Sequence, residues 1–170
     1  MVGGGSSNTA SGSTDVIGCR VENNTGSTYS TIGGGRRNTV NGTAAAIGGG
    51  EENSANEEYA AIGGGSKNTA SGKYSTVSGG EGNTASGLRS TVGGGLNNDA
   101  NGESSVISGG NINVVNGKLS TVSGGFQNKN LSGDNSAIGG GSFNIISGAN
   151  NAIGGGAPLL SPPPSPLRTW

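Results

Sequence analysis

The chain has 170 residues, of which 38 are Gly, 24 Ser, 21 Asn and 13 Thr, and nine Lys/Arg against ten Asp/Glu give a net charge of −1. There is no His and only one Cys, which excludes a His/Cys metal site and any disulfide framework within the chain. The balanced charge and the six aromatic residues provide no surface for nucleic acid or an anionic membrane. We therefore expect no cofactor, no nucleic-acid partner and no membrane partner.

Two columns of residues recur every 15 positions. Val or Ile occupies one column from Ile17 to Val122, and the series resumes at Ile138 after one extra residue near Leu131. Asn occupies the other column with the same step. A disordered low-complexity chain would not keep two columns in register through ten copies. The sequence therefore predicts a folded repeat protein.

The repeat divides the chain into two regions. Residues 1–156 form the predicted repeat domain, whose first coil is irregular around Cys19, as expected of a terminal, capping repeat. Residues 157–170 contain all five prolines and lack the repeat. They are predicted to be an extended linker or a flap over the end of the repeat domain.

Each unit contains two short segments with alternating side chains, as residues 68–71 and 75–77 illustrate. In the first segment Asn and Ala share one side, and in the second Ser and Val share one side with Thr opposite. A period of two predicts strands and excludes helices. Two strands and two turns in 15 residues make one flat coil that hydrogen-bonds the next at about 4.7–4.9 Å. The predicted fold is all-β, a parallel β-solenoid (two-sheet β-roll) of about ten 15-residue coils.

We name the two predicted sheets after the polar residue that each turns inward. The first segments form the Asn sheet and the second segments form the Ser sheet. The inward Asn and Ser columns are predicted to stack as ladders, with each amide bonding its copy above and below. Gly is expected to supply positive φ and close backbone approach at the turns, where the charged residues are also expected to lie.

The sequence contains no recognisable catalytic constellation. Gly-x-Ser-x-Gly, Gly-x-Gly-x-x-Gly and phosphate-loop motifs are missing, and the carboxylates form no recurring pair, so we expect no enzyme. A calcium-binding roll would place an Asp in each turn, whereas this chain has three Asp residues in all. Three Asn-x-Ser/Thr acceptor sequences, at Asn23, Asn41 and Asn130, occur at the level expected by chance in this composition.

The candidate functional surfaces are the two broad faces of the roll. Solenoid faces can be rich in Thr and Ser simply because these residues suit stacked strands. A flat array of hydroxyl and methyl groups also matches a periodic target such as ice. The outward column of the Ser sheet consists of Val16, Thr31, Ala46, Ala61, Thr76, Thr91, Val106, Thr121, Ala137 and Ala152. The Asn sheet turns outward Thr9, Ser11, Thr39, Ser54, Thr69, Ser71, Thr84 and Ser86 before Asp99, Val114, Lys129 and Ile145 interrupt it.

The half-unit x-x-Asn-x-Val-x-Gly, clear at residues 111–117 and 142–148, resembles the repeat of the ice-binding, recrystallisation-inhibiting proteins of grasses. The resemblance covers residues 3–156. It implies a left-handed roll, a monomer, an extracellular location and adsorption to ice through one flat sheet. The chain departs from that pattern where Ala replaces Val in the first half, as at Ala70 and Ala85. Those changes make the core thinner, but a small apolar residue still occupies the same inward position.

A second resemblance is to the head repeats of trimeric autotransporter adhesins, where Ser-Val-Ala-Ile-Gly stands in place of this chain's Ser-Thr-Val-Ser-Gly. It implies a trimer that serves as a structural or adhesive module. A close trimer needs apolar residues on the outward side of one sheet. This chain places Thr, Ala and Gly there. We therefore favour ice binding through the uncharged Ser sheet, with the Asn sheet as the alternative face.

Overall fold

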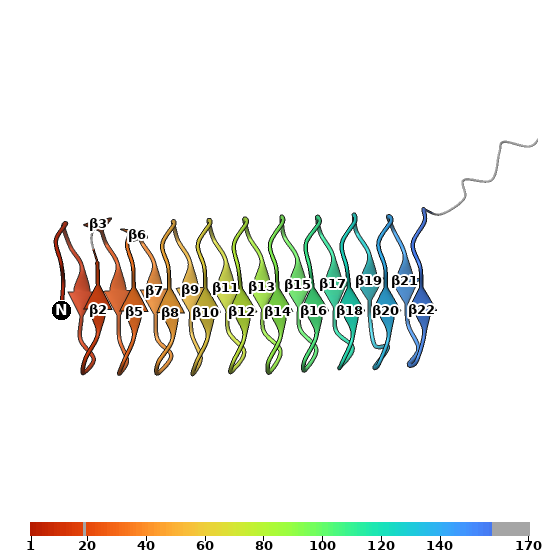
Figure 1. The fold of residues 1–170 in the computed structure, drawn as a ribbon, viewed down its shortest axis with the longest axis horizontal. Coiled ribbons are helices and arrows are strands. Elements are labelled where there is room, and N and C mark those ends of the chain that lie inside the picture. The colour runs from red at the N-terminus through yellow and green to blue at the C-terminus, as the bar shows by residue number, and fades with distance from the viewer. Residues whose placement is uncertain (19, 158–170) are drawn as a thin grey trace, which may run out of the picture.

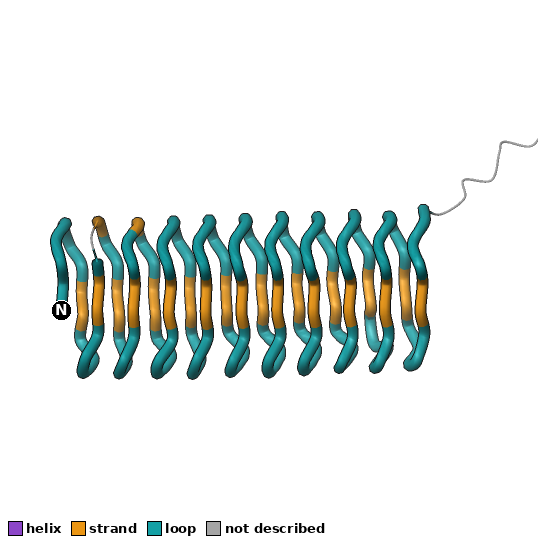
Figure 2. The backbone as a smooth tube through the Cα atoms, viewed as in Figure 1, coloured by secondary structure: helices purple, strands orange, loops and turns teal. Residues whose placement is uncertain are grey.

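The structure is a computed structural model that describes residues 1–18 and 20–157. Within those residues the chain winds into a straight rod of stacked coils with no helix (Figures 1 and 2). Two ten-stranded parallel sheets face each other along the rod. The predicted parallel two-sheet β-solenoid is confirmed. Apart from Ala157, the predicted proline-rich tail lies outside the described residues, as does Cys19.

Every strand of the two sheets has two residues, of which the first faces outward and the second inward. The Asn sheet consists of β1 (Thr9–Ala10), β4 (Asn24–Thr25), β7 (Thr39–Val40), β9 (Ser54–Ala55), β11 (Thr69–Ala70), β13 (Thr84–Ala85), β15 (Asp99–Ala100), β17 (Val114–Val115), β19 (Lys129–Asn130) and β21 (Ile145–Ile146). The Ser sheet consists of β2 (Val16–Ile17), β5 (Thr31–Ile32), β8 (Ala46–Ile47), β10 (Ala61–Ile62), β12 (Thr76–Val77), β14 (Thr91–Val92), β16 (Val106–Ile107), β18 (Thr121–Val122), β20 (Ala137–Ile138) and β22 (Ala152–Ile153).

The register between neighbouring strands equals the sequence repeat. Thr76 pairs with Thr91 in the Ser sheet, and Thr69 pairs with Thr84 in the Asn sheet. The step lengthens by one residue between Thr121 and Ala137. Because the extra residue lies in the turn between β19 and β20, both sheets continue through the insertion without a break.

A third, narrow parallel ladder, which the repeat pattern does not predict, runs along the turn that follows the Ser sheet. It contains β3 (Arg20–Val21) and β6 (Gly35–Arg36). Single parallel bridges then continue it from Arg36 to Ser142. The turn is therefore tied to its copies by backbone hydrogen bonds, such as Glu51 N–H to the Gly65 carbonyl at 2.9 Å. This ladder gives the roll a third fixed side.

The core is one layer of small side chains. Val or Ile from the Ser sheet, such as Val77 and Val92, meets Ala or Val from the Asn sheet, such as Ala70 and Ala85, and all four are fully buried. The larger aromatic residues and Leu lie at the turns and are exposed, which is consistent with an interior too thin to hold them.

The inward Asn column forms a continuous network. The side-chain oxygen of Asn83 accepts from the backbone N–H of Asn98 at 3.0 Å and from its Nδ2 at 3.1 Å. Asn83 Nδ2 donates to the carbonyls of Gly79 at 3.0 Å and Gly95 at 2.9 Å. The Asn ladder therefore also satisfies the buried N–H of the next Asn and part-buried glycine carbonyls of its own coil and of the next one.

The inward Ser column does not form the predicted ladder. Within the described chain, the buried hydroxyls of Ser75, Ser90 and Ser105 have no hydrogen-bond partner. Ser120 bonds backbone instead, donating to the Gly133 carbonyl at 2.7 Å. Ser120 Oγ also accepts from the backbone N–H of Ser136 at 3.1 Å, but no serine hydroxyl of the column bonds the hydroxyl of its copy. The predicted side-chain ladder is therefore wrong for this column.

We expect Ser90→Ala to leave stability unchanged or to raise it by up to about 1 kcal/mol, because a buried hydroxyl without a partner contributes only a desolvation cost. Ser120→Ala is the matched control and should lose about 1–3 kcal/mol, since it removes a satisfied buried bond. Urea denaturation of both variants measures the difference. A loss at Ser90 equal to that at Ser120 would contradict this assignment.

Candidate functional site

The candidate site is the outward face of the Ser sheet, at the front of Figure 1. All ten residues predicted for its outward column occupy the first position of a Ser-sheet strand. Five of them are exposed at the two ends of the column, and the five from Ala61 to Thr121 are half-buried between their neighbours in the stack. The column contains four Thr, four Ala and two Val, with no charged residue.

Within residues 1–18 and 20–157, the hydroxyl groups of this face are not used in bonds to other parts of the protein. Among the described residues, none donates a hydrogen bond to, or accepts one from, the side-chain hydroxyls of Thr31, Thr76, Thr91 or Thr121. The backbone beneath them is fixed in the ladder, as Thr76 N–H shows by donating to the Ser90 carbonyl at 2.9 Å. The face therefore presents hydroxyl and methyl groups to water from a rigid frame.

Two further ranks border this column. Two residues after each outward position stands Gly or Ser, such as Gly93 after Thr91 and Ser78 after Thr76. Two residues before it, at the turn, the side chains vary in size from Ala44 to the stacked pair Tyr59 and Tyr74, whose ring centroids are 5.1 Å apart. The flat part of the face is thus about two residues wide and is bordered along one edge by exposed turn residues.

The predicted alternative face lies on the Asn sheet, and each of its residues is in place on the outer side of that sheet. Its second rank is partly occupied with internal bonds. Asn41 Nδ2 donates to Asn56 Oδ1 at 3.1 Å, and Asn101 Nδ2 donates to Asn116 Oδ1 at 3.0 Å. Thr39 and Thr69 keep free hydroxyls within the described residues.

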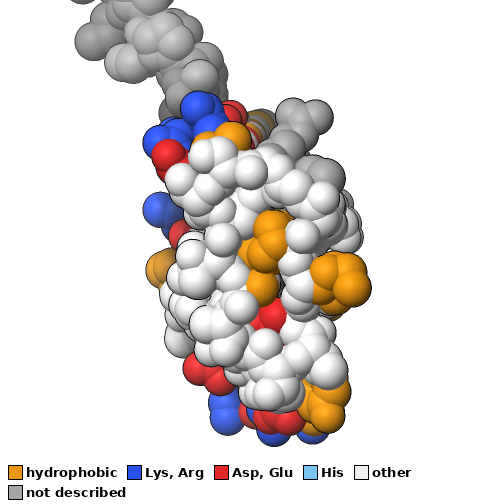
Figure 3. Space-filling model, turned by 90° about the vertical axis from the view of Figure 1, so that its left-hand side faces the viewer, with side chains coloured by type: hydrophobic (Ala, Val, Ile, Leu, Met, Phe, Trp, Pro, Cys, Tyr) orange, Lys and Arg blue, Asp and Glu red, His pale blue; other side chains and the backbone are white. Residues whose placement is uncertain are grey.

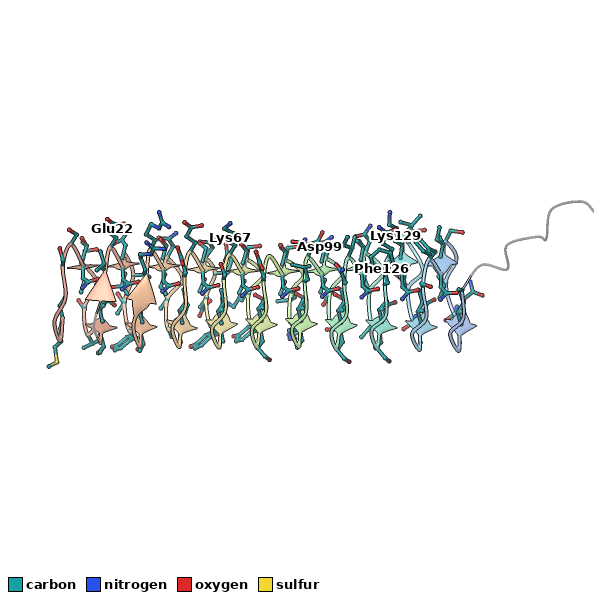
Figure 4. All side chains as sticks on the ribbon, turned by 90° about the horizontal axis from the view of Figure 1, so that it is seen from above. Glu22, Lys67, Asp99, Phe126 and Lys129 are labelled. Atoms are coloured by element: carbon teal, nitrogen blue, oxygen red, sulfur yellow. The ribbon has the colours of Figure 1, made fainter. Side chains whose placement is uncertain are left out.

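The last four strands of the Asn sheet carry Asp99, Val114, Lys129 and Ile145 outward, so this face changes chemistry along the rod. Figure 4 shows Asp99 and Lys129 on the side of the Asn sheet, away from the Ser-sheet strands. Partial burial raises the pKa of Asp99 above its ordinary value, and a hydrogen bond with Thr84 opposes that shift. An ionised Asp99 therefore lowers stability at neutral pH.

We expect Asp99→Asn to raise the melting temperature at pH 7. The folded-state pKa of Asp99 lies above its unfolded value, so the penalty is present above the folded pKa. It disappears once the pH falls below the unfolded value near 3.8. Thermal unfolding at pH 7 and pH 3 tests this, with Asp99→Asn and the unaltered chain converging at pH 3. A lower melting temperature for the variant at pH 7 would contradict it.

The remaining charges concentrate at the turns. Arg37 contacts Glu51 at 2.8 Å and Glu52 at 2.6 Å, and hydrogen bonds from Arg37 and Arg36 lower the pKa of Glu51. At the opposite turn Lys73 contacts Glu58 at 2.5 Å, which raises the pKa of Lys73. These pairs are exposed and contribute little stability. Viewed along the rod in Figure 3, most of the visible charged side chains gather at the top and bottom of the cross-section, where the turns lie.

An open groove of about 930 Å³ runs over the glycine triplets beside this face. Its walls are mainly glycine backbone, with Arg36 and Glu51 paired at one edge. Among the described residues there is no cluster of three acidic, Cys or His side chains that could hold a metal ion. The same residues contain no helix able to cross a membrane.

Fold and surface together define the chain as a parallel β-solenoid repeat protein. Comparison with protein-family models and with curated proteins gives no match.

Proposed function

We propose that the protein binds ice through the outward face of the Ser sheet and so inhibits ice growth and recrystallisation. The observation that carries the proposal is the column of ten small, uncharged side chains in register on parallel strands. Strands of one sheet lie about 4.7–4.9 Å apart, so hydroxyl and methyl groups repeat at that step along the rod. A target whose hydrogen-bonding groups repeat regularly over a wide area, such as an ice surface, suits this column.

Adsorption follows from rigidity and from the free hydroxyls. Thr side chains on fixed backbone lose little conformational freedom when they bind, which lowers the cost of association. Their methyl groups restrict nearby water, while the hydroxyls, which have no partner among the described residues, hydrogen-bond it. The ordered layer then joins the crystal. Ice between bound molecules grows as a curved front, and growth stops.

The Ser sheet supports this function better than the Asn sheet. Its outward column stays uncharged from Val16 to Ala152, whereas the Asn sheet presents Asp99 and Lys129. Charged groups hold their hydration strongly and interrupt a continuous contact. The alternative face keeps Thr9, Thr39 and Thr69 in its first rank and remains the second candidate.

A recrystallisation assay tests the class of function. Polycrystalline ice held just below its melting point should stop coarsening when the protein is added. Coarsening equal to that with the same mass of serum albumin would contradict the proposal. Sedimentation velocity run alongside distinguishes the trimeric adhesive module. A monomer is expected, because Val16 and Val106 are the only outward residues of the Ser sheet larger than Thr and Ala.

A further inference from the structure

Three acceptor sequences for N-linked glycosylation occur in the chain, and the structure separates them. Asn23 and Asn130 are fully buried. Asn41 lies on the outer side of the Asn sheet and is exposed, as is Thr43, which completes its acceptor sequence. We infer that Asn41 is the N-glycosylation site of this protein when the chain passes through a secretory pathway that attaches such glycans.

The two buried asparagines cannot carry a sugar in the folded roll. Asn23 is part of the inward ladder, where its Nδ2 donates to the Gly35 carbonyl at 2.6 Å and its Oδ1 accepts from Asn38 N–H at 3.1 Å. Asn130 closes the turn that contains the insertion, with Nδ2 donating to the Gly133 carbonyl at 2.8 Å. Asn23 Nδ2 also donates to Asn8 Oδ1 at 3.2 Å, so both of its hydrogens are used. Because both side chains are fully buried, a glycan at either nitrogen would have to occupy the core.

Asn41 has room on its outer side. Gly26 stands beside it in the preceding coil, and a Cβ there would lie 3.6 Å from Asn41 Oδ1, which is ordinary contact. On the other side Asn41 Nδ2 donates one hydrogen to Asn56 Oδ1 at 3.1 Å. An amide nitrogen carries two hydrogens. One can therefore be replaced by a sugar while the other keeps the bond to Asn56.

The reaction is a group transfer from a lipid-linked oligosaccharide diphosphate. The Asn41 Nδ2–C1 bond forms, the bond from sugar C1 to the diphosphate oxygen breaks, and the proton leaves Nδ2 as the lipid diphosphate departs. Chains modified at Asn23 or Asn130 would not complete the roll. The folded, secreted product is therefore expected to carry one glycan.

The inference rests on burial and bonding and does not depend on the proposed function, but it bears on the choice of face. A glycan at Asn41 would cover the Asn sheet around Thr39 and would leave the Ser sheet on the opposite side of the roll open. Ice activity of the glycosylated protein is a separate readout. Retained ice activity would favour the Ser sheet as the binding face. Loss of ice activity would not alter the conclusion on glycan attachment at Asn41, which is measured separately.

The experiment is secretion of the full chain, behind a leader peptide, from yeast, followed by peptide-N-glycosidase treatment and peptide mass mapping. We expect one glycan and conversion of Asn41 to Asp on its release. Asn41→Gln and Thr43→Ala should each abolish it. Ser132→Ala and Thr25→Val, which remove the acceptor sequences of Asn130 and Asn23, should leave it in place. A secreted product without glycan, or a glycan that persists in Asn41→Gln, would overturn the inference.

Discussion

Replacement of Thr76 by Tyr is expected to abolish ice shaping while the roll stays folded. Thr76 lies near the middle of the Ser-sheet column, between Ala61 and Thr91. A tyrosine ring there would stand above the methyl groups of the neighbouring strands and hold the face away from a flat surface. We expect at least a tenfold fall in recrystallisation inhibition, equivalent to about 1.4 kcal/mol of adsorption free energy. Thr91→Tyr should act in the same way.

Thr69→Tyr is the matched control, because Thr69 occupies the corresponding outward position on the Asn sheet and is equally half-buried. It should leave ice activity intact. Circular dichroism of both variants should show unchanged β-structure, since Tyr is well accepted in strands. Retained activity in Thr76→Tyr, with a loss in Thr69→Tyr or Thr84→Tyr, would transfer the function to the Asn sheet.

Replacement of Asn83 by Ala is expected to have the largest effect on stability. It would leave the buried N–H of Asn98 without an acceptor, and it would remove a donor from the part-buried carbonyls of Gly79 and Gly95. The Gly95 carbonyl keeps the N–H of Glu81 at 2.9 Å. An unpaired buried N–H costs about 1–3 kcal/mol, and the loss of the other two bonds brings the expected total to about 3 kcal/mol. Because each coil contacts only its neighbours, unfolding should begin at the altered coil, which hydrogen exchange can detect.

Asn101→Ala provides the control for that measurement. Asn101 also bonds an asparagine of the next coil, with Nδ2 donating to Asn116 Oδ1 at 3.0 Å, but this bond is exposed to solvent. Its removal should change stability by no more than about 0.5 kcal/mol. If Asn83→Ala and Asn101→Ala proved equally mild, the inward ladder would not be what holds the coils together.

The arrangement of the coils could be predicted from periodicity because the two columns that recur every 15 residues, Val/Ile and Asn, are buried and accept few residue types. One of these columns holds a branched apolar residue, such as Val77, and the other holds an asparagine that bonds its copies, such as Asn68. The alternation within each half-unit then decides which residues face outward. The 15-residue step thus predicted the strand register that the structure shows.

Other features left little trace in the sequence. The third ladder passes through Arg36, Glu51 and Ser66, where the side chains point to solvent and vary freely. Left-handed backbone was expected at Gly, and the third glycine of a triplet adopts it, as Gly50 does at φ 90°. The same conformation occurs at Glu52 and Tyr74, with φ near 60°. Asn stands at some of the equivalent turn positions, and Asn adopts left-handed backbone more easily than most residues. That was the signal in the sequence for positive φ at these turns.

The central claim is that this roll adsorbs to ice, and partition into slowly growing ice measures it directly. The folded chain, mixed in dilute buffer with a protein of similar size that does not bind ice, is frozen onto a cold finger until half of the volume is solid. Enrichment of the chain in the ice fraction, with the other protein left in the liquid, is the predicted result. Exclusion of both proteins from the ice would contradict the claim.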